Sequence, residues 1–290
     1  MPVTQKGLLP NAYRQIHIAA DGFKERILKG RLYHDSREGG MSFTGLSEMI
    51  LILEELFDEI HYPVKSVDYR TFSGKSRELR EEAGEMKVSQ PLTERKGKKA
   101  DFMLHVKYRY NATWQGIITN LGTGEKKSFL SLMELMDILA VSFKDPIRPG
   151  GNGFGKGMCE VTVRNYEGCQ KEGDSSRPAA DRRIFINEFD LKEKLAAMLN
   201  PLSEGSCPDS IMLPRSFRVT VEDYGPATFV IRILFRKNAT WQGTVSWREN
   251  RFQVNFRSFM ELLLLMQEAV GRTGKWIQEE RNACAGVREK

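Results

Sequence analysis

Hydrophobic and polar residues alternate with the period of a β-strand in three consecutive segments near the C-terminal end of the chain. The segments cover residues 229–236, 241–248 and 252–256, and short polar turns separate them. Beyond the third segment the pattern changes, because Ser258 with Glu261 three places later is typical of a helix N-cap and an apolar run follows. The pattern predicts three antiparallel strands followed by one helix, a β-β-β-α unit.

A spacing of thirteen residues from a glycine to a phenylalanine marks the same unit at three places. These intervals are Gly30–Phe43, Gly116–Phe129 and Gly243–Phe256. In the last two, the glycine ends an identical hexapeptide, Asn-Ala-Thr-Trp-Gln-Gly, and its tryptophan alternates in phase with the inward apolar residues. A unit that recurs in this way predicts an internal repeat with both tryptophans in the core.

A fourth and more divergent copy follows the same rule in the second half of the chain. Phe185, Asn187 and Asp190 keep the spacing of the marker phenylalanine and the two capping positions, and a helix is expected over residues 191–199. The hairpin that precedes it, from Glu160 onward, would carry a longer loop. The fold class is therefore predicted to be α+β, with four β-β-β-α modules, each an antiparallel sheet with one helix, arranged as a tandem duplication of a two-module half.

Polar and glycine-rich stretches suggest where these modules begin and end. The expected divisions are module A over 1–72, a flexible linker over 73–100, module B over 101–144, an inter-half linker over 145–157, the divergent module A′ over 158–217, module B′ over 218–271 and a tail over 272–290. The stretch 150–157 is rich in glycine, but its spacing departs from phosphate-binding loops, so a linker is the better interpretation.

The last helix is apolar nearly all round, because it contains the run Leu262–Met266. One sheet cannot cover both of its faces. We expect module A to pack against module B, helix beside helix; the alternative is that the apolar surface serves a homo-oligomer. The marker glycine would lie on the inward face of the second strand, where it lets the helix approach closely.

Composition narrows the function without naming it. The formal charge of +6 and the pI near 9.1 permit an anionic partner. No apolar run approaches the roughly 20 residues that span a bilayer, and no secretory signal is visible, so we expect a cytoplasmic protein without a membrane partner. The four histidines and four cysteines lack ligand spacing, and no nucleophile stands out. We therefore expect no metal, no cofactor, no catalytic residue and no enzymatic activity.

The outer faces of the sheets are the candidate contact surface. With Phe235 and the other alternating apolar residues inward, arginine, lysine and amide side chains point outward. These candidates are Arg232, Arg236, Gln242, Arg248 and Arg251 in the last copy, Lys107 and Arg109 in the second, and Lys29 and Arg31 in the first. Such a face suits a nucleic acid, with arginines on phosphates and amides on base edges, but any half-buried antiparallel sheet also has a polar outer face.

The segment from Thr240 to Val245, together with Phe256-Arg257-Ser258 and Met260-Glu261-Leu262-Leu263, resembles an uncharacterised bacterial family that is common in anaerobic Firmicutes. The resemblance implies an N-terminal module, a variable linker and this C-terminal module, and it implies no activity, cofactor or substrate. The leading hypothesis is a non-enzymatic binding or adaptor protein that contacts another protein through apolar helix surface or free sheet edges. The alternative is nucleic-acid binding through the basic sheet faces.

Overall fold

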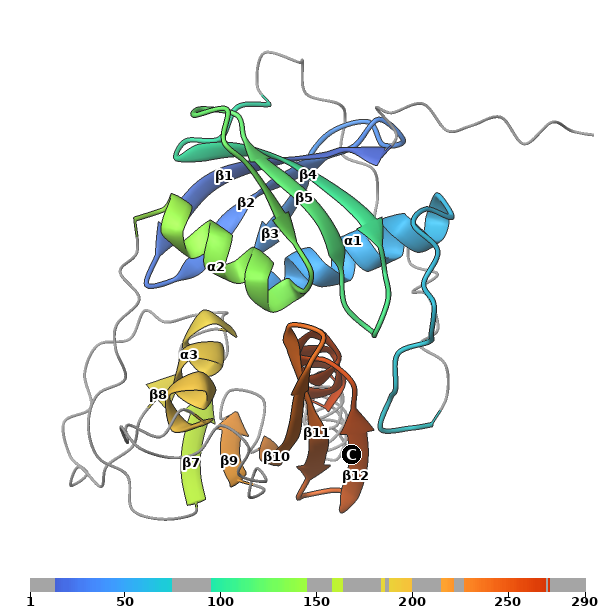
Figure 1. The fold of residues 1–290 in the computed structure, drawn as a ribbon, viewed down its shortest axis with the longest axis vertical. Helices are drawn as coiled ribbons and strands as arrows, with labels where there is room; N and C mark the ends of the chain where they lie inside the picture. The colour runs from blue at the N-terminus through green and yellow to red at the C-terminus, as the bar shows by residue number, and fades with distance from the viewer. Residues whose placement is uncertain are drawn as a thin grey trace, which may run out of the picture.

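The computed structural model of the chain describes residues 14–74, 95–144, 158–163, 184–185, 188–199, 215–221, 227–269 and 271. Within these ranges the fold is α+β, as predicted, with two six-stranded sheets and helices between them (Figure 1). The expected inter-half linker with its glycine-rich stretch, most of the linker over 73–100, the tail, and Cys169, Cys207 and Cys284 lie outside the described residues.

The first sheet is antiparallel throughout, in the order β3-β2-β1-β4-β5-β6. Its elements are β1 (Ile16–Lys24), β2 (Ile27–Tyr33), β3 (Met41–Thr44), α1 (Leu46–Glu59), β4 (Ala100–Tyr108), β5 (Gln115–Asn120), β6 (Lys126–Phe129) and α2 (Leu132–Ser142). Two β-β-β-α segments thus share one sheet, and they join where β1 pairs with β4. The prediction that modules A and B meet helix beside helix is wrong in this respect, because the first strand of each module, β1 and β4, forms the junction at the centre of the sheet.

The second sheet has the order β12-β11-β10-β9-β7-β8. Its elements are β7 (Met158–Val163), β8 (Ile184–Phe185), α3 (Glu188–Leu199), β9 (Arg215–Val221), β10 (Ala227–Lys237), β11 (Thr240–Trp247) and β12 (Phe252–Phe256), followed by a helix over residues 259–269. β9 to β12 pair antiparallel, whereas β7 is parallel to both β8 and β9. The expected antiparallel hairpin from Glu160 is therefore wrong. Parallel strands need a crossover connection of a dozen or more residues, and the sequence between β7 and β8 is long enough for one.

Each marker glycine lies opposite a residue that directly precedes a β-bulge in the neighbouring strand. The pairs are Gly30 with Ala20, Gly116 with Val106 and Gly243 with Ile233. A Cβ at these glycines would lie 2.4, 2.1 and 1.9 Å from a backbone carbonyl oxygen of that strand. Close strand packing at the bulge therefore requires glycine, and the predicted approach of the helix is not the reason.

The recurrent hexapeptide builds the turn that follows each bulge. Asn111 and Ala112 both have left-handed backbone, as do Asn238 and Ala239, with φ between 54° and 56°. Two consecutive positive φ values make the tight hairpin turn whose twist matches that of its strands. The hydroxyl of the next residue, Thr113, accepts from the first amide of α2 at 3.0 Å, and its counterpart in the second sheet does the same for the 259–269 helix at 2.9 Å.

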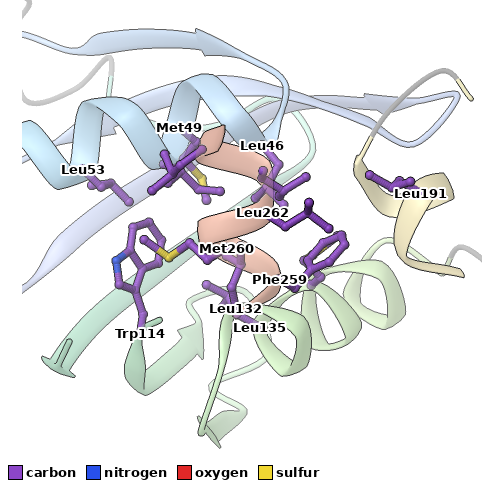
Figure 2. Packing of buried hydrophobic residues seen from close by; sticks show 14 of the residues in the cluster. Leu46, Met49, Leu53, Trp114, Leu132, Leu135, Leu191, Phe259, Met260 and Leu262 are labelled. Carbon is purple, nitrogen blue, oxygen red and sulfur yellow. The ribbon is translucent and has the colours of Figure 1, made fainter. Parts of the chain in front are cut away.

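One hydrophobic core joins the two sheets. Trp114 and Trp241 are buried in it, which confirms the predicted inward orientation. The helix over residues 259–269 is buried except at Gln267 and Glu268, which are half-buried, and Figure 2 shows its residues Phe259, Met260 and Leu262 among side chains of α1 and α2, with Leu191 of α3 to one side. Helices from both halves of the chain therefore cover the apolar helix, so no second copy is needed to bury it.

The two halves also exchange hydrogen bonds between helix caps and hairpin turns. Ser131 caps α2 by accepting from the amide of Glu134, and its hydroxyl donates to the carbonyl of Ala239 at 2.6 Å. Reciprocally, Ser258 accepts from the amide of Glu261 at 2.9 Å and donates to the carbonyl of Ala112 at 2.5 Å. Ser131 and Ser258 are confirmed as helix caps, whereas Glu134 and Glu261 accept from the amides of Leu130 and Arg257, one residue before each cap. Each serine also binds the opposite half.

Candidate functional site

Some of the predicted arginines of the second sheet are exposed on or beside its outer face. Arg232 on β10 is exposed, and its cross-strand partner on β11 is Thr244. Arg248 and Arg251 are exposed in the turn before β12. The amide of Gln242, however, closes the hairpin turn by bonding the backbone N–H and C=O of Lys237 at 3.0 and 2.8 Å. Gln242 is thus engaged in the fold and does not present its amide outward.

The β-bulges change which face the last residues of β4 and β10 lie on. One extra residue on the bulged strand reverses the alternation beyond it. Phe235 therefore pairs with Gln242 on the outer side and is 55% exposed, whereas Arg236 pairs with the inward Trp241. The prediction that Phe235 faces inward is wrong for this reason. Arg236 is exposed, but its pairing with Trp241 puts it out of phase with Arg232 on β10.

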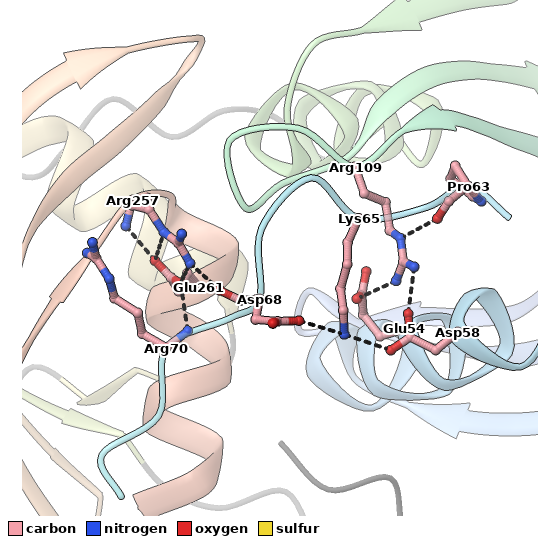
Figure 3. Close-up of polar contacts among 9 residues, drawn as sticks. All are labelled: Glu54, Asp58, Pro63, Lys65, Asp68, Arg70, Arg109, Arg257 and Glu261. Atoms are coloured by element: carbon pink, nitrogen blue, oxygen red, sulfur yellow. Dashed lines mark hydrogen bonds and ion pairs between the residues drawn. The ribbon is translucent and has the colours of Figure 1, made fainter. Parts of the chain in front are cut away.

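The same reversal buries Arg109, which the sequence pattern placed on the outer face. Its side chain is 2% exposed and donates to Glu54 at 2.9 Å, to Asp58 at 2.6 Å and to the carbonyl of Pro63 at 2.7 Å (Figure 3). The indole N–H of Trp114 donates to the other oxygen of Glu54. Because these bonds tie Arg109 to α1 and to the segment that follows it, Arg109 holds the fold together and is unavailable to a ligand.

Burial and hydrogen bonding act in opposite directions on the carboxyl groups of this cluster. Burial raises the pKa of Glu54 despite the charge of Arg109 and the Trp114 hydrogen bond. Burial acts in the same direction on Asp58, but there the hydrogen bonds from Arg109 and Lys65 outweigh it, so the pKa of Asp58 is lowered. Asp58 is therefore the carboxylate of the cluster whose charge contributes to folding stability.

A second polar group continues this cluster toward the opposite half. Lys65 bridges Asp58 at 3.0 Å and Asp68 at 3.5 Å, and the backbone carbonyl of Asp68 accepts from Arg257. Arg257 in turn pairs with Glu261, which also accepts from the amide of Arg70 (Figure 3). The segment after α1 is thereby fixed to the start of the 259–269 helix, and these groups serve the junction between the halves.

On the first sheet, the two predicted residues of β2 differ in their surroundings. Lys29 is exposed. Arg31 forms two hydrogen bonds with Asp21, both at 3.1 Å, and a third with the hydroxyl of Tyr33 at 3.0 Å. The neighbouring His17 binds Asp101 at 2.9 Å and stacks on Tyr33. This part of the outer face is a satisfied polar network, so of the two only Lys29 is open to a partner.

Lys107 is exposed in the bulge of β4, and it is one of the cations that surround His105 of the same strand. The imidazole Nε2 of His105 is buried without a hydrogen-bond partner among the described residues. Burial, followed by the charges of Lys107, Arg14 and Lys126, lowers the pKa of His105. All three cations therefore lie within electrostatic range of one ring.

The end of β4 also presents an apolar patch to solvent, which we name the Tyr108 patch: Val64, Tyr108, Tyr110 and Leu130. Their exposed fractions are 71%, 51%, 51% and 61%. The tyrosine rings stack with centroids 5.2 Å apart, and the amide of Gln115 binds the carbonyls of both Tyr110 and Leu130. Val64 lies beside Tyr108, because the next residues in each segment form a parallel bridge. Large apolar side chains grouped in this way are typical of an interaction surface.

Comparison with protein-family models, with curated proteins and with solved structures found no match for this chain. In the part of the chain that the structure covers, no helix is long and apolar enough to span a bilayer. Within the same residues, no three His, Cys, Asp or Glu side chains are grouped so that they could hold a metal ion.

Sequence reasoning placed Lys107 on the outer face but missed the Tyr108 patch and the approach of Arg14 to His105. Tyr108 looks inward by simple alternation, and only a bulge at Lys107 turns it outward. Gly116, in the middle of a strand, was the available signal, because an interior glycine often marks a bulge. For Arg14 no local signal existed, since its approach to His105 depends on the pairing of β1 with β4.

Proposed function

We propose that the chain arose by tandem duplication of a two-module half, in the order A, B, A′, B′, and that it belongs with the duplicated-module bacterial family that its motif resembles. Three hairpins with the same glycine, bulge and left-handed turn support this proposal. The start of α3 supports a fourth copy, because Glu188 follows Phe185 at the same offset as Leu46 follows Phe43. The parallel strand β7 marks the divergence of A′.

We further propose that the protein is a non-enzymatic, cytoplasmic binding protein that contacts another protein. The Tyr108 patch carries this proposal, since the 259–269 helix is buried inside the chain and cannot serve a partner. Tyrosine is enriched in interface hot spots, because it presents a large rigid apolar ring with a polar tip. The edge strands of the described sheets, β3, β6, β8 and β12, are less suitable, because they are short and β6 carries two lysines.

The test is proximity crosslinking in the native host with two variants of matched exposure. The double variant Tyr108→Ser with Tyr110→Ser should lose a protein that the wild type captures. Val141→Ser removes a side chain of similar exposure, 52%, from α2 and should retain that protein. Equal melting temperatures establish that both variants fold. If the double variant captures the same proteins as the wild type, the patch is not the contact surface.

Nucleic-acid binding is the second candidate, favoured by the exposed Arg232, Arg248 and Arg251 on the second sheet. The outer faces of the two sheets point away from each other, with the helices between them (Figure 1). One duplex therefore cannot contact both faces at once, and each face would bind its own segment. Retention of mixed DNA or RNA with a steep inverse salt dependence, lost when these arginines are changed to serine, supports this candidate; no retention at low salt refutes it.

A further inference from the structure

Within the described residues, the outer face of β4 and its neighbours carries His105, Lys107 and Lys126 with few carboxylates nearby. Across the first sheet, His105 pairs with Ile117 and Ile117 with Ser128, so the imidazole and the Ser128 hydroxyl lie in one row on the outer face. Lys126 occupies the adjoining row opposite Thr119. Since paired residues share a face, three strands direct polar groups to one area.

Arg14, two residues before β1, adds a charge that acts on His105. Its guanidinium carbon lies 5.1 Å from the centre of the Tyr62 ring, and its Nε is buried without a hydrogen-bond partner in the described structure. Lys107 enters from the bulge of β4, where the extra residue interrupts the ladder. We refer to Arg14, His105, Lys107 and Lys126 as the His105 cluster.

Carboxylates on the same elements are committed elsewhere. Asp101 of β4 binds His17 and the amide of Gly97, and Glu125, just before β6, binds Lys127 at 2.9 Å. Within the described ranges, neither Lys107 nor Lys126 forms an ion pair. Cations held close together without a counter-charge repel one another and cost folding free energy, and an external anion removes that cost.

We propose that the His105 cluster binds a phosphate group. The two lysines and Arg14 supply charge-assisted donors, and the hydroxyls of Ser128 and Thr119 add neutral ones. Lys107 and Lys126 are exposed side chains on flexible stems, so they can move to admit the anion above the imidazole. The ring then gains a counter-charge and holds a proton on the nitrogen that lacks a partner. This site is distinct from the Tyr108 patch and does not depend on it.

Histidine NMR on the wild-type protein tests the proposal directly. The chain has four histidines, so the imidazole signal of His105 is assigned by its loss in His105→Gln. Inorganic phosphate, a nucleoside 5′-monophosphate and a short single-stranded DNA are titrated separately at low salt. We expect a saturable shift of the His105 signal and a rise in its pKa, while the exposed His61 stays unchanged.

Charge-matched variants then locate the site. Lys107→Gln and Lys126→Gln should each weaken binding roughly tenfold, whereas Lys29→Gln, which removes the same charge from β2, should weaken it less than about twofold. Saturation by inorganic phosphate identifies a small phosphate ligand, and saturation by DNA alone identifies a nucleic-acid backbone; both support the proposal. The proposal is overturned if no probe gives a saturable shift or if Lys29→Gln is as damaging. DNA that binds through Arg232 and leaves the His105 signal unmoved would also overturn it, while supporting the nucleic-acid candidate above.

Discussion

Replacing Ser258 by alanine tests whether the two halves of the chain are joined by the exchange of hydrogen bonds at their helix caps. The hydroxyl of Ser258 accepts from the amide of Glu261 and donates to the carbonyl of Ala112, and both Ser258 and Ala112 are buried. Loss of an N-cap costs about 1 kcal/mol. A buried carbonyl left without its donor costs about 1 to 3 kcal/mol more. We therefore expect Ser258→Ala to lower the free energy of unfolding by about 2 to 4 kcal/mol.

Two further variants separate the contributions. Glycine caps a helix nearly as well as serine, so Ser258→Gly should retain the cap and lose only the bond between the halves, about 1 to 3 kcal/mol. Ser128→Ala removes an exposed hydroxyl from β6 and should change stability by less than about 0.5 kcal/mol. Urea unfolding followed by tryptophan fluorescence gives each value. If Ser258→Ala costs no more than an ordinary cap and Ser258→Gly costs only a few tenths, the bond to Ala112 contributes nothing and the reasoning fails.

Two other predictions follow from the packing and the charges. Gly116→Ala should destabilise by about 2 to 4 kcal/mol in urea unfolding, since its Cβ would lie 2.1 Å from the carbonyl oxygen of His105, whereas Gly22→Ala, which has open space, should be tolerated. Because the pKa of Asp58 is lowered in the folded state, its contribution to stability is present above its unfolded pKa of about 4 and is lost as pH falls through the folded value. Asp58→Asn should therefore flatten the acid side of the stability–pH profile, and an unchanged slope there would contradict the assignment.

Local patterns predicted the elements well and their assembly poorly. In the described part of the chain the marker phenylalanine locates each helix start, because Leu46, Leu132, Glu188 and residue 259 each follow their phenylalanine by the same interval. Strand pairing across the chain leaves no comparable trace. β1 joins β4 through hydrogen bonds of the backbone, which any sequence can make, so the shared sheet could not be read from side chains.

The prediction of which residues form the candidate site failed mainly because of one β-bulge in β4. A single extra residue at Lys107 reverses the facing of everything after it, which brings Tyr108 into solvent and Arg109 into the core. Alternation therefore placed Arg232, before the bulge of β10, correctly on the outer face, whereas Arg236, after the bulge, is exposed but pairs with the inward Trp241. Interior glycines such as Gly243 are the positions where strict alternation should be abandoned.

The exchange between Ser131 and Ala239, and between Ser258 and Ala112, has the geometry of an isologous contact made within one polypeptide. The segment ending at residue 144 carries both partners of this bond, a cap serine and a turn carbonyl, on its own surface. Two copies of that segment could therefore satisfy each other as the halves do here. Under the duplication proposed above, an ancestral homodimer that later fused into one chain would leave such a reciprocal contact behind.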